Sequence, residues 1–358
     1  MRILVFYGNE LSASRGTPSR ARNIARALAA REGTEVLAVS RDSKLEIPGL
    51  GHRSLAETTL LDSVVGFRPD VVYGHTHKAL PHLAAIDSSA RVVDLHGDPV
   101  AEKLEETWRP RGRRLRSAAR MWWTDRRYLG RVDGCTTVSR LLAKRVERRG
   151  LPARVIRGGV DPALFAAATG EPGPGLVIGY AGNFRPYQGL QVLFEAASTL
   201  LSSGVELRLI LVGDPGDGAL GKRALETFGD RVELTGPLPY ADVPAALAAA
   251  NVLVIPRPDS GTARAGLPSK LAEYMALGKA LIVTDVGDQA AVIRDNDAGI
   301  VVAPDDAASL ARALERLRHN GLRERLGSNA RATAERSLTW KTIADEIVDF
   351  LHEVLDRR

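Results

Sequence analysis

The chain has 358 residues, of which 44% are hydrophobic and 26% are charged, as expected of a globular protein with two domains of ordinary size. No apolar run reaches the roughly 18–20 residues that cross a membrane, and the first apolar run is too short for a signal peptide. A single cysteine, Cys135, can form no internal disulfide. These features exclude fibrous, disordered and membrane-spanning classes and predict a cytoplasmic enzyme.

Positive charge is concentrated in the first half of the chain. Residues 1–172 contain 29 Lys and Arg against 19 Asp and Glu, whereas residues 173–358 contain 20 against 24. The densest stretch, Arg109–Arg131, carries nine arginines together with Trp122 and Trp123. A basic helix with tryptophans is typical of a segment that lies on anionic lipid, so it indicates peripheral membrane contact. The alternative is a solvated charged face with the tryptophans packed into the domain. We expect no nucleic-acid partner.

Short β-branched runs alternate with helical patterns along the whole chain, which is typical of parallel sheets with crossover helices. Most runs are almost continuously apolar, as in strands buried on both faces. In the first half, strands are predicted over Ile3–Tyr7, Val36–Ser40, Asp70–Tyr73, Arg91–Leu95, Gly134–Val138 and Arg154–Arg157, and helices over Pro18–Arg31 and Arg140–Arg149. In the second half, strands are predicted over Leu176–Tyr180, Glu206–Val212, Arg231–Leu234, Val252–Ile255, Ala280–Thr284 and Ile300–Val302, and helices over Gly189–Leu201, Tyr240–Ala249, Lys270–Leu277 and Ala307–Leu317.

The pattern restarts after a Pro/Gly-rich stretch, and this predicts an α/β fold of two doubly wound, Rossmann-like domains that face each other across a cleft. The expected boundaries are residues 1–168 for the first domain, 169–175 for the linker, 176–336 for the second domain and 337–358 for a C-terminal helix that packs back toward the first domain. In such sheets, ligands bind beyond the carboxyl ends of the strands, so candidate sites are sought there.

The loop after the first strand is the first candidate. Thr17 is predicted as the N-cap of a helix and Pro18 as its first residue. Free backbone N–H groups at a helix start favour an anion or a hydroxyl, Gly16 lets a ligand approach the main chain, and Arg15 and Arg20 add charge. The glycine spacing is not the dinucleotide fingerprint, which disfavours a nicotinamide or flavin cofactor. A plain strand–helix turn is the alternative.

Histidines follow two of the predicted strands. His96 stands at the carboxyl end of VVDLHGDP, where its ring would point into the cleft. A structural histidine is the alternative there. His75 and His77, with His82 nearby, invite comparison with a metal site, but no further ligand stands at a suitable spacing, and we expect no metal.

The segment AGNFRPYQG lies between a strand and a long helix of the second half. Gly182 stands at the turn, and Arg185 in the loop would meet a phosphate at the start of the helix. A solvated arginine is the alternative.

The segment 260–288 predicts a short helix that starts after Ser269 as N-cap and stops at Gly278. Its first backbone N–H groups, at Lys270 and Leu271, suit a diphosphate, and the Lys270 ammonium is placed to pair with it.

Two neighbours extend this candidate site. Gly266 removes side-chain bulk just before the helix, and Glu273, one turn in, is placed to accept hydrogen bonds from ribose hydroxyls. The alternative for Glu273 is compensation of the helix dipole, since acids favour the first turn.

Several motifs in order resemble the retaining glycosyltransferases of family 4, which have the two-domain GT-B fold. The first half contains RPDVVYGHTH, VVDLHGDP, CTTVSRLLAKRV and GGVDPALF, and the second half contains IGYAGNFRPYQGL, LILVGD, RVELTGPLP and PSKLAEYMALGKALIVTD. The resemblance covers nearly the whole chain. It implies a nucleotide-diphosphate sugar of UDP or GDP type in the second domain and a hydroxyl acceptor, either a lipid-linked saccharide or a small molecule, held mainly by the first.

By motif, the resemblance also assigns residues. It implies that Glu273 holds the ribose, that the backbone of the TGPL segment (Gly236 and Leu238) lies near the base, that Ser269–Leu271 holds the diphosphate and that His96 lies near the transferred sugar. The residues expected to act in catalysis are His96, Arg185 and Lys270; those expected to bind the donor are Gly182, Arg185, Gly236, Leu238, Gly266, Ser269, Lys270, Leu271 and Glu273; and those expected to bind the acceptor are Arg15, Gly16, Thr17 and Arg20. Retention implies no protein nucleophile, no cofactor and no obligatory metal; catalysis would then come from positioning and charge stabilisation.

The sequence departs from the family pattern at three positions. The first of two glutamates common in the family is replaced by Ala265, and an arginine and a lysine by Asn183 and Gln188. A branch with a PSKLxEYMA-type donor motif is closer, and in it Lys270 and Arg185 would preserve the charge. The alternatives are a catalytically degenerate sugar-nucleotide-binding protein and a sugar-nucleotide epimerase of the same fold.

Overall fold

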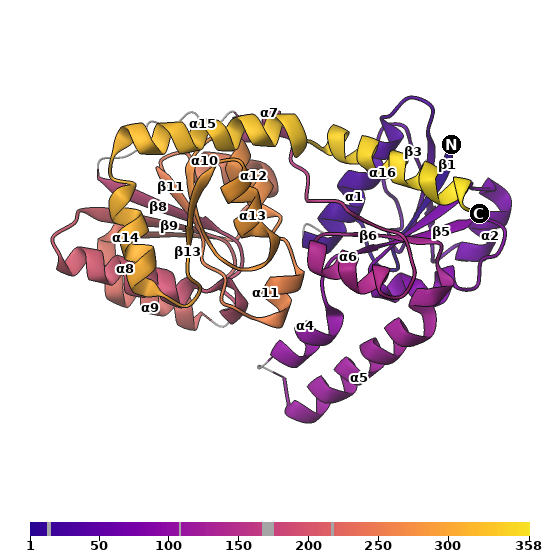
Figure 1. Cartoon of the computed structure of the whole chain (residues 1–358), viewed down its shortest axis with the longest axis horizontal. Coiled ribbons are helices and arrows are strands. Elements are labelled where there is room, and N and C mark those ends of the chain that lie inside the picture. The colour runs from indigo at the N-terminus through magenta and orange to yellow at the C-terminus, as the bar shows by residue number, and fades with distance from the viewer. Residues whose placement is uncertain (13–15, 107–108, 167–174, 216–217) are drawn as a thin grey trace. The chain divides into compact units, whose positions relative to one another are not determined.

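The computed structural model of the chain describes residues 1–12, 16–106, 109–166, 175–215 and 218–358. They form two compact units, drawn with their elements labelled in Figure 1. Unit 1 comprises Met1–Gly158, Ala265–Leu267 and Trp340–Arg358, and unit 2 comprises Gly159–Arg264 and Pro268–Thr339. Of the predicted linker, residues 169–174 lie outside the described residues.

Unit 1 is built on a seven-stranded parallel sheet with the order β3-β2-β1-β4-β5-β6-β7. The strands are β1 (Arg2–Phe6), β2 (Glu35–Ser40), β3 (Leu50–Ser54), β4 (Val71–His75), β5 (Ala90–Leu95), β6 (Gly134–Thr137) and β7 (Ala153–Val155). The order reverses direction between β1 and β4, which is the point where doubly wound sheets bind ligands.

Helices cover both faces of this sheet because successive strand residues point to opposite faces. Ile3 and Val5 of β1 are buried in one core, and Leu4 and Phe6 in the other. The helices of unit 1 are α1 (Gly16–Ala29), α2 (Leu60–Phe67), α3 (Leu80–Leu83), α4 (Pro99–Glu105), α5 (Arg111–Tyr128), α6 (Arg140–Glu147) and α16 (Trp340–Asp356), with the 3-10 turns η1 (His77–Ala79) and η2 (Leu129–Arg131).

The last helix of the chain, α16, packs in unit 1, where it lies along α1 (Figure 1). Its apolar face, which includes Phe350 and Leu351, shares a core with β1 and α1. The helix begins at Trp340, later than the expected position 337, because Ser337 still belongs to the preceding helix and Thr339 forms a β-bridge with Val160.

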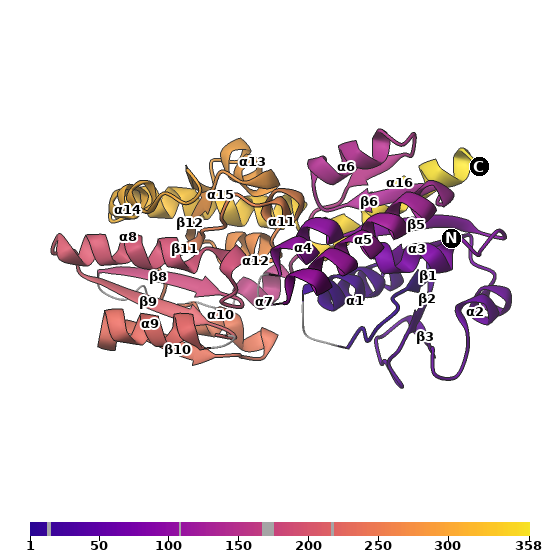
Figure 2. The same cartoon turned by 90° about the horizontal axis from the view of Figure 1, so that it is seen from below.

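Unit 2 repeats the architecture with a six-stranded parallel sheet in the order β10-β9-β8-β11-β12-β13. The strands are β8 (Leu176–Ala181), β9 (Leu207–Val212), β10 (Val232–Gly236), β11 (Val252–Ile255), β12 (Ala280–Thr284) and β13 (Gly299–Val302). The helices are α7 (Pro162–Ala166), α8 (Leu190–Ser202), α9 (Ala219–Phe228), α10 (Val243–Ala246), α11 (Gly261–Ala265), α12 (Lys270–Ala276), α13 (Gly287–Asp295), α14 (Ala307–Arg316) and α15 (Asn320–Ser337), with the 3-10 turns η3 (Pro186–Gln188), η4 (Gly229–Arg231) and η5 (Tyr240–Asp242). Figure 2 shows helices on both sides of this sheet.

The predicted fold class is confirmed, since both sheets are parallel and doubly wound. Strand β3 and several helices, among them α2, α9, α13 and α15, were not predicted. The prediction of Thr17 as an N-cap is wrong: α1 already includes Gly16, so Thr17 lies inside the first turn. A proline at the next position is tolerated there because the N–H groups of a first turn have no partner within the helix.

We predict that Leu351→Ala lowers the free energy of unfolding by about 2–5 kcal/mol, because a fully buried side chain in the α1–α16 core leaves a cavity when truncated. Urea unfolding followed by circular dichroism measures the change. The exposed neighbour His352→Ala is the control and should stay within about 0.5 kcal/mol of the parent. Equal losses for both variants would contradict the packing of this face.

Candidate functional site

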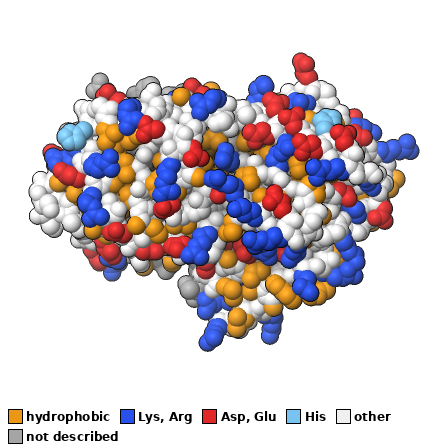
Figure 3. All heavy atoms as spheres, viewed as in Figure 1, with side chains coloured by type: hydrophobic (Ala, Val, Ile, Leu, Met, Phe, Trp, Pro, Cys, Tyr) orange, Lys and Arg blue, Asp and Glu red, His pale blue; other side chains and the backbone are white. Residues whose placement is uncertain are grey.

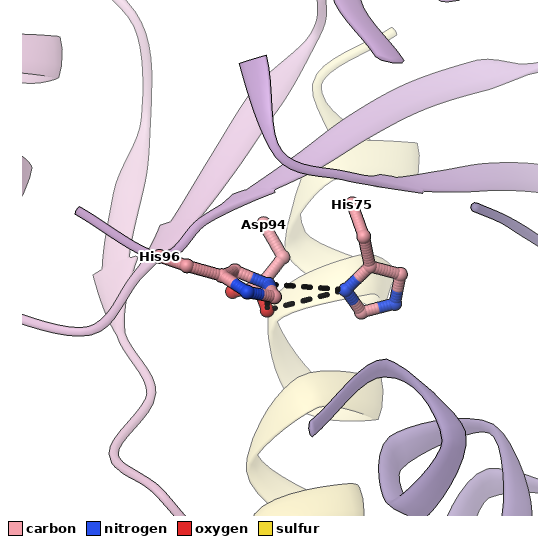
Figure 4. A group of neighbouring side chains, drawn as sticks. All are labelled: His75, Asp94 and His96. Carbon is pink, nitrogen blue, oxygen red and sulfur yellow. Dashed lines mark hydrogen bonds and ion pairs between the residues drawn. The ribbon is translucent and has the colours of Figure 1, made fainter. Parts of the chain in front are cut away.

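In unit 1, charged and polar side chains meet at the carboxyl ends of β4 and β5. Asp94 lies in β5, His96 directly follows that strand, and His75 ends β4. The Asp94 carboxylate accepts a hydrogen bond from His96 Nε2 at 2.7 Å, and His75 Nδ1 lies 3.4 Å from the same oxygen (Figure 4). Arg20 of α1 completes the group with Nε at 2.8 Å and Nη2 at 3.2 Å from the two carboxylate oxygens. We call these four residues the Asp94 cluster.

The cluster carries one buried positive and one buried negative charge. Burial alone would raise the pKa of Asp94, but the Arg20 charge and the histidine hydrogen bonds outweigh it and hold this pKa well below its usual range. Burial lowers the pKa of His96 to about 4, so the ring is neutral at pH 7. The arginine and the carboxylate therefore balance each other, and the neutral His96 ring adds hydrogen-bonding capacity without charge.

A pocket of about 240 Å³ opens beside the cluster, at the switch point of the sheet. His96 and Thr17 line it together with residues of the loops after β1 and β4 and of α4 and α5: Tyr7, Asn9, Thr76, His77, Lys78, Gly97, Pro99, Glu102, Lys103 and Met121. Thr76 has φ +69°, a conformation that costs about 1–3 kcal/mol in a residue other than glycine and that is concentrated at functional sites.

The three histidines that were compared with a metal site do not come together. His75 belongs to the Asp94 cluster, His77 pairs with Asp125 at 3.4 Å, and His82 packs edge-on against Phe6. The ligand atoms of His75, Asp94 and His96 do lie within 4.8 Å of one another. In the described structure, however, the Arg20 guanidinium already holds both carboxylate oxygens.

The residues expected to bind the acceptor are distributed differently from the prediction. Arg15 lies outside the described residues, Gly16 begins α1, and Thr17 lines the pocket. Arg20 is 9% exposed and is engaged by Asp94 and by the carbonyl oxygens of residues 156 and 157, so its position is that of a structural cation in the wall of the site.

In unit 2, Lys270 at the start of α12 reaches toward the carboxyl end of β8. Its Nζ lies 4.0 Å above the ring of Tyr180 and donates a hydrogen bond to Gln188 Oε1 at 3.2 Å. Gly182 has φ +142°, and a Cβ there would lie 2.5 Å from Lys270 Nζ, so only glycine leaves room for the ammonium. Burial, and then the charge of Arg257, lower the pKa of Lys270 to about 7. We call Tyr180, Gly182, Gln188 and Lys270 the Lys270 cluster.

Glu273 lies one turn further along α12. Its carboxylate accepts a hydrogen bond from the Tyr240 hydroxyl at 3.2 Å, and burial raises its pKa to about 7. A carboxyl group in this state offers the hydrogen-bonding oxygens that sugar hydroxyls use.

Four further donor-site residues can be placed. Gly236 and Leu238 lie at the carboxyl-end edge of the sheet of unit 2, whereas Gly266 and Leu271 are exceptions. Gly236 ends β10 with φ +69°, and Leu238 follows it. Gly266 belongs to the Ala265–Leu267 piece of unit 1 and is not part of the Lys270 cluster. The N–H of Leu271 donates to the carbonyl of Pro268, so it is not open for a ligand in this conformation.

Two further predicted features of the donor site can be placed. Ser269 precedes α12 as expected, but its backbone is helical and its side chain forms no capping hydrogen bond, so the side-chain N-cap is wrong. Arg185 directly precedes η3 in the loop after β8.

Three residues that shape these sites were not predicted. Asp94 organises the cluster in unit 1, Arg257 faces Lys270 in unit 2, and Tyr240 holds Glu273. Arg257 had a signal in the sequence, because it follows Pro256 at the end of a predicted strand. Asp94 had one too, as a charged residue inside an apolar run.

Comparison with known proteins gives the class. Residues 14–164 match the family model described as Glycosyltransferase Family 4, and residues 175–320 match the model described as Glycosyl transferases group 1. These matches show that the first half of the chain is a family 4 glycosyltransferase domain and that its second half is a group 1 glycosyl transferase domain. The two doubly wound sheets are the architecture of the GT-B fold.

Individual relatives agree with this class. The phosphatidyl-myo-inositol mannosyltransferase of Mycolicibacterium smegmatis is 30% identical over 194 residues, which are 53% of this chain and 49% of that protein. The chain spans about half the length of the curated relatives it matches.

Solved structures share the fold over the full length. Sucrose-phosphate synthase from Thermosynechococcus elongatus has a TM-score of 0.80 at 19% identity and covers 100% of both chains. Anabaena Alr3699/HepE in complex with UDP-glucose has a TM-score of 0.73 at 20% identity and covers 99% of this chain and 100% of that chain.

We predict that Lys270 makes stability depend on pH. The unfolded chain holds this proton up to its ordinary pKa near 10.4, whereas the folded chain releases it near pH 7, so the unfolding free energy gained from this group rises as the pH rises above 7. The difference between the parent and Lys270→Met should change by about 2 kcal/mol between pH 7 and pH 9 in urea unfolding. The exposed Lys222→Met variant should run parallel to the parent. Parallel curves for Lys270→Met as well would mean that Lys270 titrates normally.

Proposed function

We propose that this chain transfers a sugar from a nucleotide-diphosphate sugar of UDP or GDP type to a hydroxyl acceptor, with retention of anomeric configuration and without a metal or other cofactor. The observation that carries the proposal is the Lys270 cluster. The buried Lys270 amine lies at the switch point of unit 2 against a neutral amide, where a bound diphosphate would stabilise its charged form.

The cluster also supports activity despite the departures from the family pattern. The Lys270 ammonium reaches Gln188, the position at which the family commonly has a lysine. A lysine at both positions would place two ammonium groups within hydrogen-bonding distance of each other. We therefore infer that Lys270 supplies from α12 the charge that Gln188 lacks, as expected for a branch with the PSKLxEYMA motif.

Each proposed role follows from position. Lys270, with Arg257 and Arg185, would stabilise the charge that develops on the departing diphosphate. Glu273 would accept hydrogen bonds from the ribose, and the backbone at Gly236 would approach the base.

In unit 1, His96 would contact the transferred sugar from the pocket wall, and the pocket would hold the acceptor. The domain roles follow: residues 1–168 would hold the acceptor and residues 176–336 the donor.

Donor binding is tested on the Lys270 cluster. UDP and GDP should each be titrated by calorimetry against the parent, Lys270→Met and Lys222→Met. We expect one nucleotide to bind the parent and the Lys222 variant equally, and Lys270→Met to weaken its affinity and to lower kcat for the matching sugar nucleotide by about 10²–10³-fold, since a lost transition-state contact costs about 3–4 kcal/mol.

Three outcomes decide between the proposed function and its alternatives. Binding without turnover for any acceptor would favour a degenerate sugar-nucleotide-binding protein. Donor consumption without acceptor, giving a new sugar nucleotide, would favour an epimerase. No binding of either nucleotide would refute the donor site.

The acceptor class is indicated by the hairpin of α4 and α5. Its outer surface exposes Leu104 (43%), Leu115 (51%), Trp122 (50%) and Trp123 (52%). Figure 3 shows hydrophobic side chains gathered over this hairpin and bordered by lysines and arginines. About half of each indole is therefore accessible to solvent, which supports a surface role over complete packing into the domain. Among the described residues, no helix combines the length and hydropathy needed to cross a bilayer.

The hairpin of α4 and α5 is held to the rest of unit 1 through Asp125. Asp125 of α5 is 1% exposed and forms ion pairs with Arg145 of α6 at 2.8 Å and with Arg149, just beyond the end of α6, at 3.1 Å. Exposed aromatic residues ringed by arginines match a surface of anionic headgroups. We infer that the protein is a cytoplasmic enzyme that lies peripherally on the membrane and takes a lipid-linked acceptor, as the name of the mycolicibacterial relative also suggests.

We predict that the chain co-sediments with liposomes of phosphatidylglycerol and phosphatidylcholine and that salt weakens the binding. Replacing Trp122 and Trp123 with serine should weaken it at least about tenfold, because two half-exposed indoles no longer enter the interface. Leu225→Ser in α9, which removes an equally exposed apolar side chain from unit 2, is the control. Equal binding of all three proteins, or none by the parent at low salt, would favour a small soluble acceptor.

A further inference from the structure

The Asp94 carboxylate is contacted from several separate segments of unit 1, and Figure 4 shows it with His75 and His96. Arg20 comes from α1, His75 from β4, Asp94 from β5, and Thr136 from β6, whose hydroxyl donates to Asp94 Oδ1 at 2.7 Å. Asp94 itself is 0% exposed. A buried carboxylate with this many converging donors defines the hydrogen-bonding state of each neighbour.

We infer that Asp94 is a positioning residue for His96: it keeps the His96 proton on Nε2, so that Nδ1 remains an acceptor for a hydroxyl of the bound sugar. The role of Nδ1 rests on the proposed transfer function, whereas the location of the proton does not.

The tautomer follows from the chemistry of the contact. An ionised carboxylate can only accept hydrogen bonds, so the 2.7 Å contact with Asp94 Oδ2 requires a proton on His96 Nε2. A neutral imidazole has a single N–H, so Nδ1 then carries a lone pair. Burial lowers the pKa of His96 to about 4, which keeps the ring neutral in the physiological range.

The lone pair on His96 Nδ1 is unused in the described structure. The atom is buried and has no hydrogen-bond partner among the described residues. An unpaired buried acceptor lowers stability, so it persists where it serves a ligand. The His96 side chain is 11% exposed and lines the pocket, so we assign a hydroxyl of a ligand bound there as the partner that Nδ1 lacks.

Asp94 is held ionised so that this arrangement does not depend on ordinary changes of pH. Arg20 is itself fixed by donating to the carbonyl oxygens of Ile156 and Arg157, both at 2.9 Å. The Tyr73 hydroxyl pairs with Thr136 at 2.6 Å and so holds the donor to the second carboxylate oxygen. The carboxylate can neither rotate nor take up a proton without breaking several contacts.

His75 contacts the Asp94 carboxylate and does not line the pocket. Its Nδ1 lies 3.4 Å from Asp94 Oδ2 and 3.3 Å from His96 Nε2, and its side chain is 0% exposed. A proton on His75 Nδ1 adds a further donor to Asp94 and prevents that nitrogen from drawing the His96 proton away. His75 thereby reinforces the same tautomer.

The test is Asp94→Asn in the full-length chain. An asparagine amide can donate to Nε2, which moves the His96 proton to Nδ1 and removes the acceptor. In long-range ¹H–¹⁵N spectra of ¹⁵N-histidine-labelled protein, with His96→Gln used for assignment, we expect a protonated Nε2 in the parent and a protonated Nδ1 in Asp94→Asn. We expect kcat for the sugar nucleotide to fall by about 10²–10⁴-fold, as when a catalytic histidine is held in the wrong tautomer, while UDP or GDP affinity stays unchanged.

Two further proteins separate positioning from folding. Asp94→Asn leaves the Arg20 charge buried without its partner, so the charge-neutral double variant Arg20→Gln/Asp94→Asn serves where the single variant does not fold. Asp133→Asn breaks the comparable bidentate pair with Arg91, at 3.0 Å, away from His96 and should leave the tautomer and kcat as in the parent.

The outcomes are distinct. A parent His96 protonated on Nδ1, or a tautomer unchanged in the folded Asp94 variants, overturns the inference whatever the enzyme does. A loss of kcat in Asp133→Asn as large as in Asp94→Asn overturns it as well, because the effect would then be general loosening. No nucleotide binding by the parent refutes the proposed function but leaves the tautomer measurement intact.

Discussion

Both units obey one constraint: a parallel strand buried on both faces can carry polar side chains only where the strand ends. All carboxyl ends of a parallel sheet meet at one edge, and every crossover helix starts or ends beside it. The polar chemistry of this chain accordingly collects at two edges. In unit 1 it is the edge where β1, β4 and β5 end, and in unit 2 the edge where β8 and β11 end. Asp94 is a charged exception, because it is placed inside β5 and needs a dedicated cation.

The two edges differ in what balances their buried charge. In unit 1 the Arg20 guanidinium balances Asp94 within the protein, and the His96 ring is neutral at pH 7. In unit 2 the Lys270 ammonium faces an amide and an aromatic ring, and Arg257 adds more positive charge nearby. The first arrangement suits uncharged hydroxyl groups and the second suits a phosphate. The electrostatics of each edge therefore match one partner of the proposed reaction, since a sugar and an acceptor are neutral at the reacting atoms and the leaving group is not.

Much of this was readable from the sequence, and the reasons are physical. Near-continuous apolar runs predicted all six strands of unit 2 and six of the seven in unit 1, because burial on both faces leaves no other composition. Strand β3 (LGHRS) was not predicted because it is an edge strand with polar, half-exposed residues. Helix α15 escaped because it packs through small residues: a Cβ on Gly327 would lie 2.2 Å from the carbonyl oxygen of Gly278.

Some residues of the candidate sites could be inferred from local sequence patterns, whereas others depend on contacts between distant parts of the chain. His96, Gly182 and Lys270 stand next to strand or helix ends, so their positions could be inferred from local patterns. The role of Asp94 depends on Arg20, which is 74 residues away in the chain, and no local pattern reveals such a pair. Arg20 was assigned to the acceptor for its charge, and its burial beside Asp94 could not be read from a helix start. A pairing between distant segments becomes visible only once the sheet order brings α1 beside β5.

Part of the excess positive charge of the first half of the chain lies on helix α5. Helix α5 has two functional sides: Met121 lines the pocket, and the next two residues are the exposed tryptophans. His77, on the opposite wall of the pocket, contacts Asp125 of the same helix at 3.4 Å. A surface that contacts the outside of α5 is therefore only one helix thickness from this pocket. Under the proposed function, an acceptor held in that surface by a lipid tail would reach the pocket without leaving it, because basic charge, exposed indoles and a pocket-lining residue occur on one helix.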